Sequence, residues 1–96
     1  MIVHIVMFQF KEENKAANIK NVVEQLEALE EKIDVLASME VGVDFNGSER
    51  AFDLALYSTF ATKEDLKTYA THPEHLKVVK LIKEVSTQSR VVDYIK

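Results

Sequence analysis

Three histidines and one tyrosine are the side chains of this sequence best suited to proton transfer. His72 and His75 flank the single proline in the segment YATHPEH, and Tyr69 lies one helical turn upstream. His4 lies in the N-terminal segment MIVHIVMFQF. Imidazole gives and takes a proton near neutral pH, and a tyrosine hydroxyl can donate a hydrogen bond to a developing oxyanion. His4, Tyr69 and His75 are therefore the candidate catalytic residues.

A metal site is the second chemistry that the histidines suggest. His72 and His75 are spaced i, i+3, but Pro73 between them interrupts a continuous helix. A protein zinc site needs three or four converging ligands, and further ligands would have to come from His4, Asp65 or Glu74. Two histidines around a proline are a weak signal beside a His-Glu-x-x-His pattern, so we predict no metal site.

A purely structural role is the alternative for each of these residues. A histidine on an apolar strand is usually a hydrogen-bonded core residue, and a tyrosine on the apolar side of a helix usually packs with its hydroxyl at the rim. On this interpretation His72 and His75 only hold together a helix junction that begins at Pro73.

Nucleophilic and nucleotide chemistry have less support. The chain has no cysteine, and its serines lie in no nucleophile-elbow context. With only Gly42 and Gly47 in the chain, there is no phosphate-binding or dinucleotide-binding loop. We therefore predict that the protein binds no cofactor.

Length and composition indicate one small globular domain, residues 1–96. The net charge of −4 and the scattered basic residues argue against nucleic-acid binding. No apolar stretch approaches the roughly 20 residues that cross a bilayer, and the N-terminal segment lacks the features of a signal peptide. Without cysteines no disulfide framework can form. We expect a soluble cytoplasmic protein with neither a nucleic-acid nor a membrane partner.

Apolar spacing predicts a strand and then a helix. Segment 2–10 is β-branched and aromatic with both faces mostly apolar, so both faces are expected to be covered. From Ile19 to Ile33 apolar residues recur at three- and four-residue steps opposite charged ones, which predicts an amphipathic helix. Asn14 or Asn18 is the expected N-cap.

The rest of the chain predicts three more strands and two helices. Strands are expected at 39–45, 51–60 and 89–95, with a turn at residues 46–48 and Gly42 at a bulge or a point of close approach. Thr62 and Asp65 form a capping signal for a short helix. Pro73 ends that helix and suits the first turn of the next one, residues 73–85.

This element order, β-α-β-β-α-α-β, indicates an α+β fold of the ferredoxin-like type, a split βαβ with a four-stranded antiparallel sheet. The helices would cover one face of the sheet. The other face would carry apolar side chains, namely Val3, Ile5, Met7, Ala55 and Tyr57. A bare apolar face is an interaction surface, and twofold self-pairing is the commonest solution. We therefore predict a homodimer through the sheet face.

Three segments resemble the stress-responsive A/B barrel domain, also called Dabb. They are HIVMFQFK near the start, FATKEDLKTYATHPEH in the middle and VVDY near the end. The resemblance covers nearly the whole chain, and the strand histidine combined with a Tyr-x-x-His-Pro-x-His segment is fairly specific. It implies a ferredoxin-like protomer that pairs into a homodimeric α/β barrel.

The resemblance also implies a reaction and a pocket. One plant member of the family is a polyketide cyclase that works without a cofactor, and its reactive positions match His4, Tyr69 and His75. There the histidine matching His75 would be the general base or acid, the tyrosine would steady the enolate, and His4 would position the substrate. By the same matching, a pocket for a small, mostly apolar ligand would be lined by Val6, Phe8, Val22, Val23, Leu26, Leu56, Ala70 and Leu76.

The chain departs from that cyclase in its pocket, where aliphatic Val22, Val23 and Leu26 stand in place of aromatic side chains. Many bacterial members carry the His-Pro-x-His segment without an assigned activity. Two alternatives to cofactor-free acid–base chemistry therefore remain. One is a non-enzymatic stress-related binding protein, and the other is a cofactor-free monooxygenase-like barrel, which only the shared fold favours.

Overall fold

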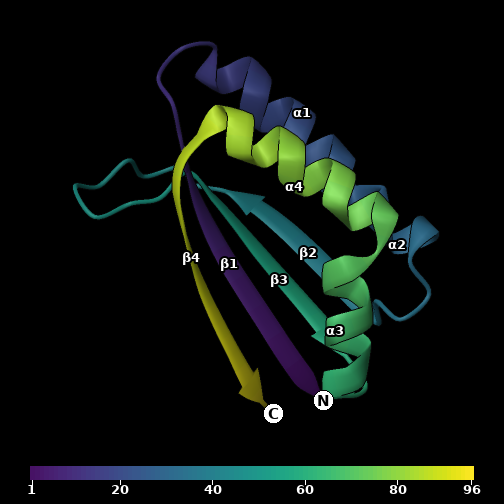
Figure 1. Ribbon diagram of the computed structural model, residues 1–96. Helices are drawn as coiled ribbons and strands as arrows, with labels where there is room; N and C mark the ends of the chain where they lie inside the picture. Colours follow the sequence, from purple (N-terminus) through teal and green to yellow (C-terminus); the bar gives the residue numbers. More distant parts are fainter.

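Four antiparallel strands form a sheet that is covered by helices on one face (Figure 1). The computed structural model describes all residues, 1–96. The elements are β1 (Ile2–Phe10), α1 (Lys15–Glu27), α2 (Leu29–Lys32), β2 (Ser38–Val43), β3 (Leu54–Phe60), α3 (Lys63–Thr71), α4 (Pro73–Val85) and β4 (Ser86–Ile95). The strand order β2-β3-β1-β4 confirms the predicted ferredoxin-like α+β fold. None of the helices has the length and apolar character needed to span a membrane.

The hydrophobic core lies between the sheet and the helices. Even-numbered residues of β1 and β3 point toward α1 and α4, so strand alternation supplies one half of the core and the apolar stripes of the helices supply the other. Fully buried members include Val22, Leu26, Leu54 and Phe60. The opposite face, which we call the open face, carries the odd-numbered residues of β1 and β3 and their cross-strand neighbours on β2 and β4.

Local signals place the ends of α3 and α4 as predicted. The Thr62 hydroxyl accepts a hydrogen bond of 3.0 Å from the backbone N–H of Asp65. His72 ends α3 and caps α4, because its Nδ1 accepts a hydrogen bond of 3.1 Å from the backbone N–H of Glu74. Pro73 is the first residue of α4. The N-caps therefore satisfy backbone donors that the helices leave free.

Asn14 occupies the N-cap position of α1, as predicted, but in a left-handed conformation (φ 55°), and neither it nor Asn18 supplies a side-chain cap. Two other local predictions are wrong. No bulge occurs at Gly42, which pairs regularly with Ala55. The predicted first helix is also divided at Ala28 into α1 and α2.

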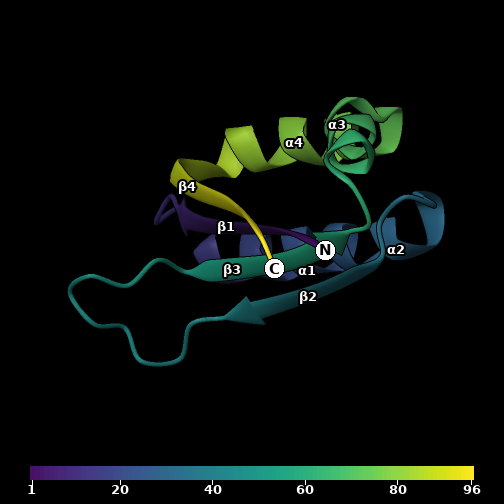
Figure 2. The same ribbon diagram turned by 90° about the horizontal axis from the view of Figure 1, so that it is seen from below.

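The connection between β2 and β3 is a long loop, residues 44–53, that projects beyond the end of the sheet (Figure 2). Asp44 holds its first turn, because its carboxylate accepts a 2.8 Å hydrogen bond from the N–H of Gly47, whose φ is +64°. Both flanking strands are shorter than the sequence predicted. The single 2.9 Å backbone bond from Asp44 to Asp53 ends the pairing.

Candidate functional site

A cavity of about 330 Å³ lies between the sheet and helix α4. Its walls are mostly apolar, and its polar groups are two imidazoles, one ammonium group and two serines. The lining residues are His4, Val6, Phe8, Leu26, Leu56, His75, Val78, Val79, Ile82, Lys83, Ser86, Ser89 and Val91. A mostly apolar cavity with a few convergent polar groups is the usual form of a small-molecule site.

His4 reaches the cavity from the middle of β1, and strand register supplies its partner. Asp93 on β4 stands directly opposite His4, so both side chains lie on the same face of the sheet. His4 Nδ1 donates a hydrogen bond to the Asp93 carboxylate. A carboxylate that accepts from one ring nitrogen fixes the tautomer and the orientation of the imidazole. On the neighbouring strand β3, the buried Ser58 hydroxyl donates a 3.1 Å hydrogen bond to the His4 carbonyl.

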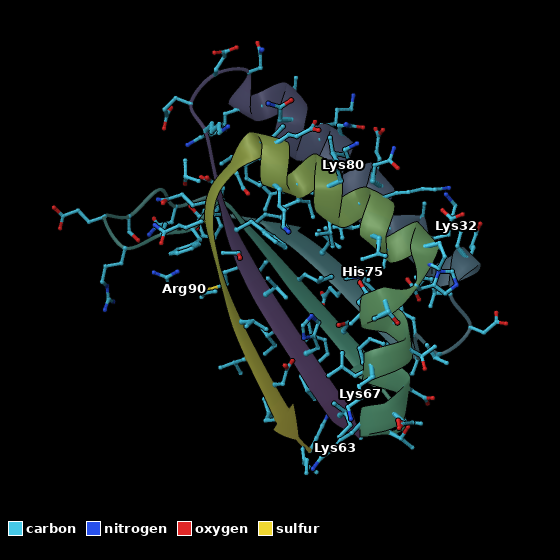
Figure 3. All side chains as sticks on the ribbon, in the orientation of Figure 1. Lys32, Lys63, Lys67, His75, Lys80 and Arg90 are labelled. Atoms are coloured by element: carbon cyan, nitrogen blue, oxygen red, sulfur yellow. The ribbon has the colours of Figure 1, made fainter.

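His75 stands at the start of α4, where α3 and α4 meet (Figure 3). Its Nδ1 lies 3.1 Å from the carbonyl oxygen of Ala70. A carbonyl can only accept, so Nδ1 carries the proton and Nε2 keeps its lone pair in the neutral ring. Burial lowers the pKa of His75 from its ordinary value of 6.5, and the charges of His4 and His72 lower it further, against the opposing effect of the Ala70 bond. His75 is therefore neutral at pH 7 and suited to act as a base.

Tyr69 packs behind these histidines and does not line the cavity. Its side chain is 1% exposed, and its ring centroid lies 4.2 Å from that of His75, 5.0 Å from Phe60 and 6.4 Å from His4. Its hydroxyl is buried without a hydrogen-bond partner in the protein. Burial raises the pKa of Tyr69 to about 12, so this hydroxyl stays a proton-bearing donor at neutral pH.

The third histidine belongs to the helix junction. His72 Nδ1 is occupied by the capping bond to Glu74, and His72 does not line the cavity. The structure brings no group of three or more His, Cys, Asp or Glu side chains together in an arrangement that could hold a metal ion.

The structure brings half of the predicted pocket residues to the cavity. Val6, Phe8, Leu26 and Leu56 line it. The other four lie elsewhere: Val22 is fully buried in the core, Val23 packs against the core, and Ala70 and Leu76 are exposed.

Several site residues were not identified from the sequence. Asp93 lies 89 residues from His4, and only the pairing of β1 with β4 brings the two together. Val78 and Ile82 belong to the apolar stripe of α4, which is indistinguishable in sequence from ordinary core residues. The spacing of Val91 and Asp93, which puts both on one face of β4, is a signal that could have pointed to this wall.

Comparison with known proteins gives the family. Residues 2–96 match the model of the Dabb family, the stress responsive A/B barrel domain. The chain is 36% identical over 80 residues to a stress-response A/B barrel domain-containing protein of Arabidopsis thaliana, a match that covers 83% of this chain and 30% of that protein. The chain spans less than half the length of the curated relatives it matches.

Solved structures share the fold. A dimeric ferredoxin-like protein of unknown function from Bacteroides fragilis is 38% identical, with a TM-score of 0.89 over 97% of this chain and 93% of that one. Hydroxynitrile lyase from Passiflora edulis is 22% identical, with a TM-score of 0.88 over 99% and 92% of the two chains. The family match extends from β1 to the C-terminus, and the chain therefore belongs to the stress-responsive A/B barrel domain family.

Proposed function

We propose that this protein is a homodimer that binds a small, mostly apolar carbonyl compound in the cavity and exchanges protons with it through His4 and His75. The observation that carries the proposal is the placement of two imidazoles on the wall of an otherwise apolar cavity. Two titratable groups in different environments can divide the roles of acid and base between them.

The shape and lining of the cavity support an apolar ligand. A volume of about 330 Å³ lies at the small end of the range for ligand pockets. Eight of the thirteen lining residues are hydrophobic, so moving a hydrocarbon portion of the ligand from water into the cavity would lower the free energy. Lys83, Ser86 and Ser89 gather where α4 leads into β4, and they could bind a polar end of the same molecule.

The two histidines suit complementary roles. His75, whose pKa is lowered, has a free Nε2 lone pair that can take a proton from a carbon next to a carbonyl group. His4 is oriented by Asp93, which accepts a hydrogen bond from Nδ1, so Nε2 is the ring nitrogen left to contact the ligand and position it. Ring contact with His75 supports a positioning role for Tyr69, and a direct hydrogen bond from its hydroxyl to the ligand is the alternative.

Two observations support the homodimer: the exposed apolar side chains of the open face and a dimeric relative. Met7, Val92 and Tyr94 expose large apolar side chains there, and a relative 38% identical over almost the whole chain is dimeric. Val3, in contrast, is fully buried within one protomer, between Thr59 and Tyr94 on the neighbouring strands.

The test is a panel of β-keto compounds with increasing alkyl length, measured for binding by calorimetry and for conversion by absorbance. His4→Ala and His75→Ala should each reduce turnover by roughly 100-fold or more, the usual size of an acid–base contribution. His72→Ala is the matched control, because His72 caps α4 and does not line the cavity. It should lower Tm and leave turnover intact. Val79→Phe should fill the cavity and abolish binding.

Two results would contradict the proposal. Folded His4 and His75 variants with wild-type turnover would remove both residues from the chemistry. If no compound binds the wild-type homodimer, the non-enzymatic role becomes the better interpretation. Oxygen consumption with a quinol would instead support the monooxygenase-like alternative, which only the shared fold favours.

A further inference from the structure

The open face of the sheet carries two charged side chains among its paired strand positions, one at each edge. Strand pairing defines three rows across this face: Ser38, Thr59, Val3 and Tyr94; then Glu40, Tyr57, Ile5 and Val92; then Gly42, Ala55, Met7 and Arg90. Glu40 lies on edge strand β2, and Arg90 lies on edge strand β4, away from the helices (Figure 3). The acidic and basic groups therefore lie on opposite edges.

Neither charge is neutralised within the protomer. Glu40 makes no ion pair or side-chain hydrogen bond, and Arg90 donates only to the carbonyl of its neighbour Ser89, at 3.0 Å. Both residues are exposed. A surface that pairs with a second copy of itself can use such charges to fix its register, since like charges brought together disfavour the wrong arrangement.

A hollow lies beside Glu40 on the open face. Its volume is about 310 Å³, and its floor includes Gly42, Ala55 and Tyr57. Gly42 lies in regular strand pairing without a positive φ, and a Cβ placed on it would meet no atom within 4 Å. The backbone therefore does not require glycine here. The missing side chain instead leaves room for a group from outside the protomer.

Two twofold arrangements can pair two such faces. An axis along the strands keeps each residue in its row and reverses the strand order, so β4 of the partner lies over β2. The partner's Arg90 then enters the row of Gly42, at the hollow beside Glu40. An axis across the strands places β2 over the partner's β2, which brings the two Glu40 carboxylates to the same edge.

We propose that the homodimer uses the first arrangement, in which β2 of each protomer faces β4 of its partner and Glu40 pairs with the partner's Arg90 over Gly42. This rests on the homodimer of the proposed function and adds its register. The twofold axis makes the contact twice per dimer. Both observations point to the same partner group, because the hollow supplies space for a long side chain and Glu40 supplies the opposite charge.

Charge reversal tests the pairing by sedimentation equilibrium of the full chain over a dilution series. Glu40→Arg and Arg90→Glu should each raise the dimer dissociation constant by about tenfold, as expected for two partly exposed ion pairs turned repulsive. The double variant Glu40→Arg/Arg90→Glu should return to within about threefold of wild type. Lys80→Glu and Glu24→Arg make matched charge changes on α4 and α1 and should have no effect.

A second variant tests the hollow without changing charge. Gly42→Leu should weaken the dimer at least as much as either charge reversal, because its side chain would occupy the space given to Arg90. Its Cβ meets nothing within the protomer, so the variant should fold, with an unchanged circular dichroism spectrum.

Cysteine cross-linking distinguishes the two arrangements directly, since the chain has no native cysteine. With a short bismaleimide, Glu40→Cys protein mixed with Arg90→Cys protein should give cross-linked dimers, and Glu40→Cys protein alone should give few. Efficient cross-linking of Glu40→Cys alone, or single reversals that dimerise like wild type, would overturn the arrangement while leaving the homodimer intact. A wild-type monomer at tens of micromolar would remove the homodimer itself.

Discussion

The two faces of the sheet are made from the same strands and differ in what covers them. On the helical face, alternate residues of β1 and β3 are buried by α1 and α4, and the cavity forms where edge strand β4 is less well covered. On the open face, apolar side chains such as Met7 and Tyr94 remain exposed, and charges lie only at the edges. The difference teaches that strand alternation puts the cavity-lining side chains and the exposed apolar side chains on opposite faces of one sheet.

The two faces differ in whether their polar side chains find hydrogen-bond or charge partners within the same chain. On the helical face half-buried His4 bonds to Asp93, and the buried Ser58 hydroxyl bonds to the His4 carbonyl, so both His4 and Ser58 find partners within the protomer. On the open face Glu40 and Arg90 have no charged partner in their own chain. Desolvating charged groups costs free energy unless they are paired, so a surface that buries these two side chains has to supply a partner for each.

The largest expected effect tests the helical face. Phe60→Ala should lower the free energy of unfolding by about 3–5 kcal/mol, the usual cost of removing a buried phenylalanine. Phe60 is fully buried and packs against Tyr69. Denaturant unfolding measures the change. Phe45→Ala, in the loop after β2, is the matched control, because Phe45 is 99% exposed and its loss should cost less than about 0.5 kcal/mol. Equal losses would contradict the assignment of the core.

The second prediction compares substitutions of two neighbouring valines, one on each face of the sheet. Val91 and Val92 on β4 are 58% and 56% exposed and point to opposite faces. Val92→Asp should weaken the dimer by roughly 3 kcal/mol, about 100-fold, because an unpaired carboxylate would be desolvated in the interface. Val91→Asp should leave dimerisation unchanged and reduce the affinity for apolar ligands. Sedimentation and calorimetry on both variants measure the two effects, and a reversed outcome would exchange the roles of the faces.

The third prediction concerns the unpartnered hydroxyl of Tyr69. Tyr69→Phe removes a buried polar group that makes no hydrogen bond in the protein, so stability should stay constant or rise by up to about 1 kcal/mol. Thermal unfolding measures this, with exposed Tyr94→Phe as the control. If turnover falls while stability rises, the hydroxyl contacts the ligand. A clear loss of stability would mean that it makes a bond in the folded state.

The smallest expected effect is a pH dependence from His75. Its pKa is lowered in the folded state by burial, so the unfolded chain binds its proton more tightly. Stability from this group is therefore complete above the unfolded pKa of about 6.5 and declines as pH falls below it. Tm measured from pH 8 to pH 5 should fall more steeply for wild type than for His75→Gln. Parallel curves would show that the ring is not buried as described.

The sequence predicted the fold from interactions that are local along the chain. Pro73 begins α4, Thr62 caps α3, and helix 73–85 has the predicted bounds. Errors occurred where tertiary context prevails over local preference. The first helix breaks at Ala28, and Asn14 holds the N-cap position in a left-handed conformation without a side-chain hydrogen bond. Gly42, expected at a bulge or a point of close approach, lies in regular pairing, and no atom of its own chain lies near the place of a Cβ.

The candidate site shows the same distinction between what local sequence predicts and what long-range contacts decide. The spacing of residues determined which side chains share a face, since a strand repeats every two residues and a helix about every 3.6. His4, Tyr69 and His75 could therefore be selected from the sequence. Only the tertiary structure decided that His4 meets Asp93, that Tyr69 lies behind the cavity wall, and that Val22 belongs to the core. Those contacts join residues far apart in the chain, and only the pairing of β1 with β4 and the packing of the helices on the sheet bring them together.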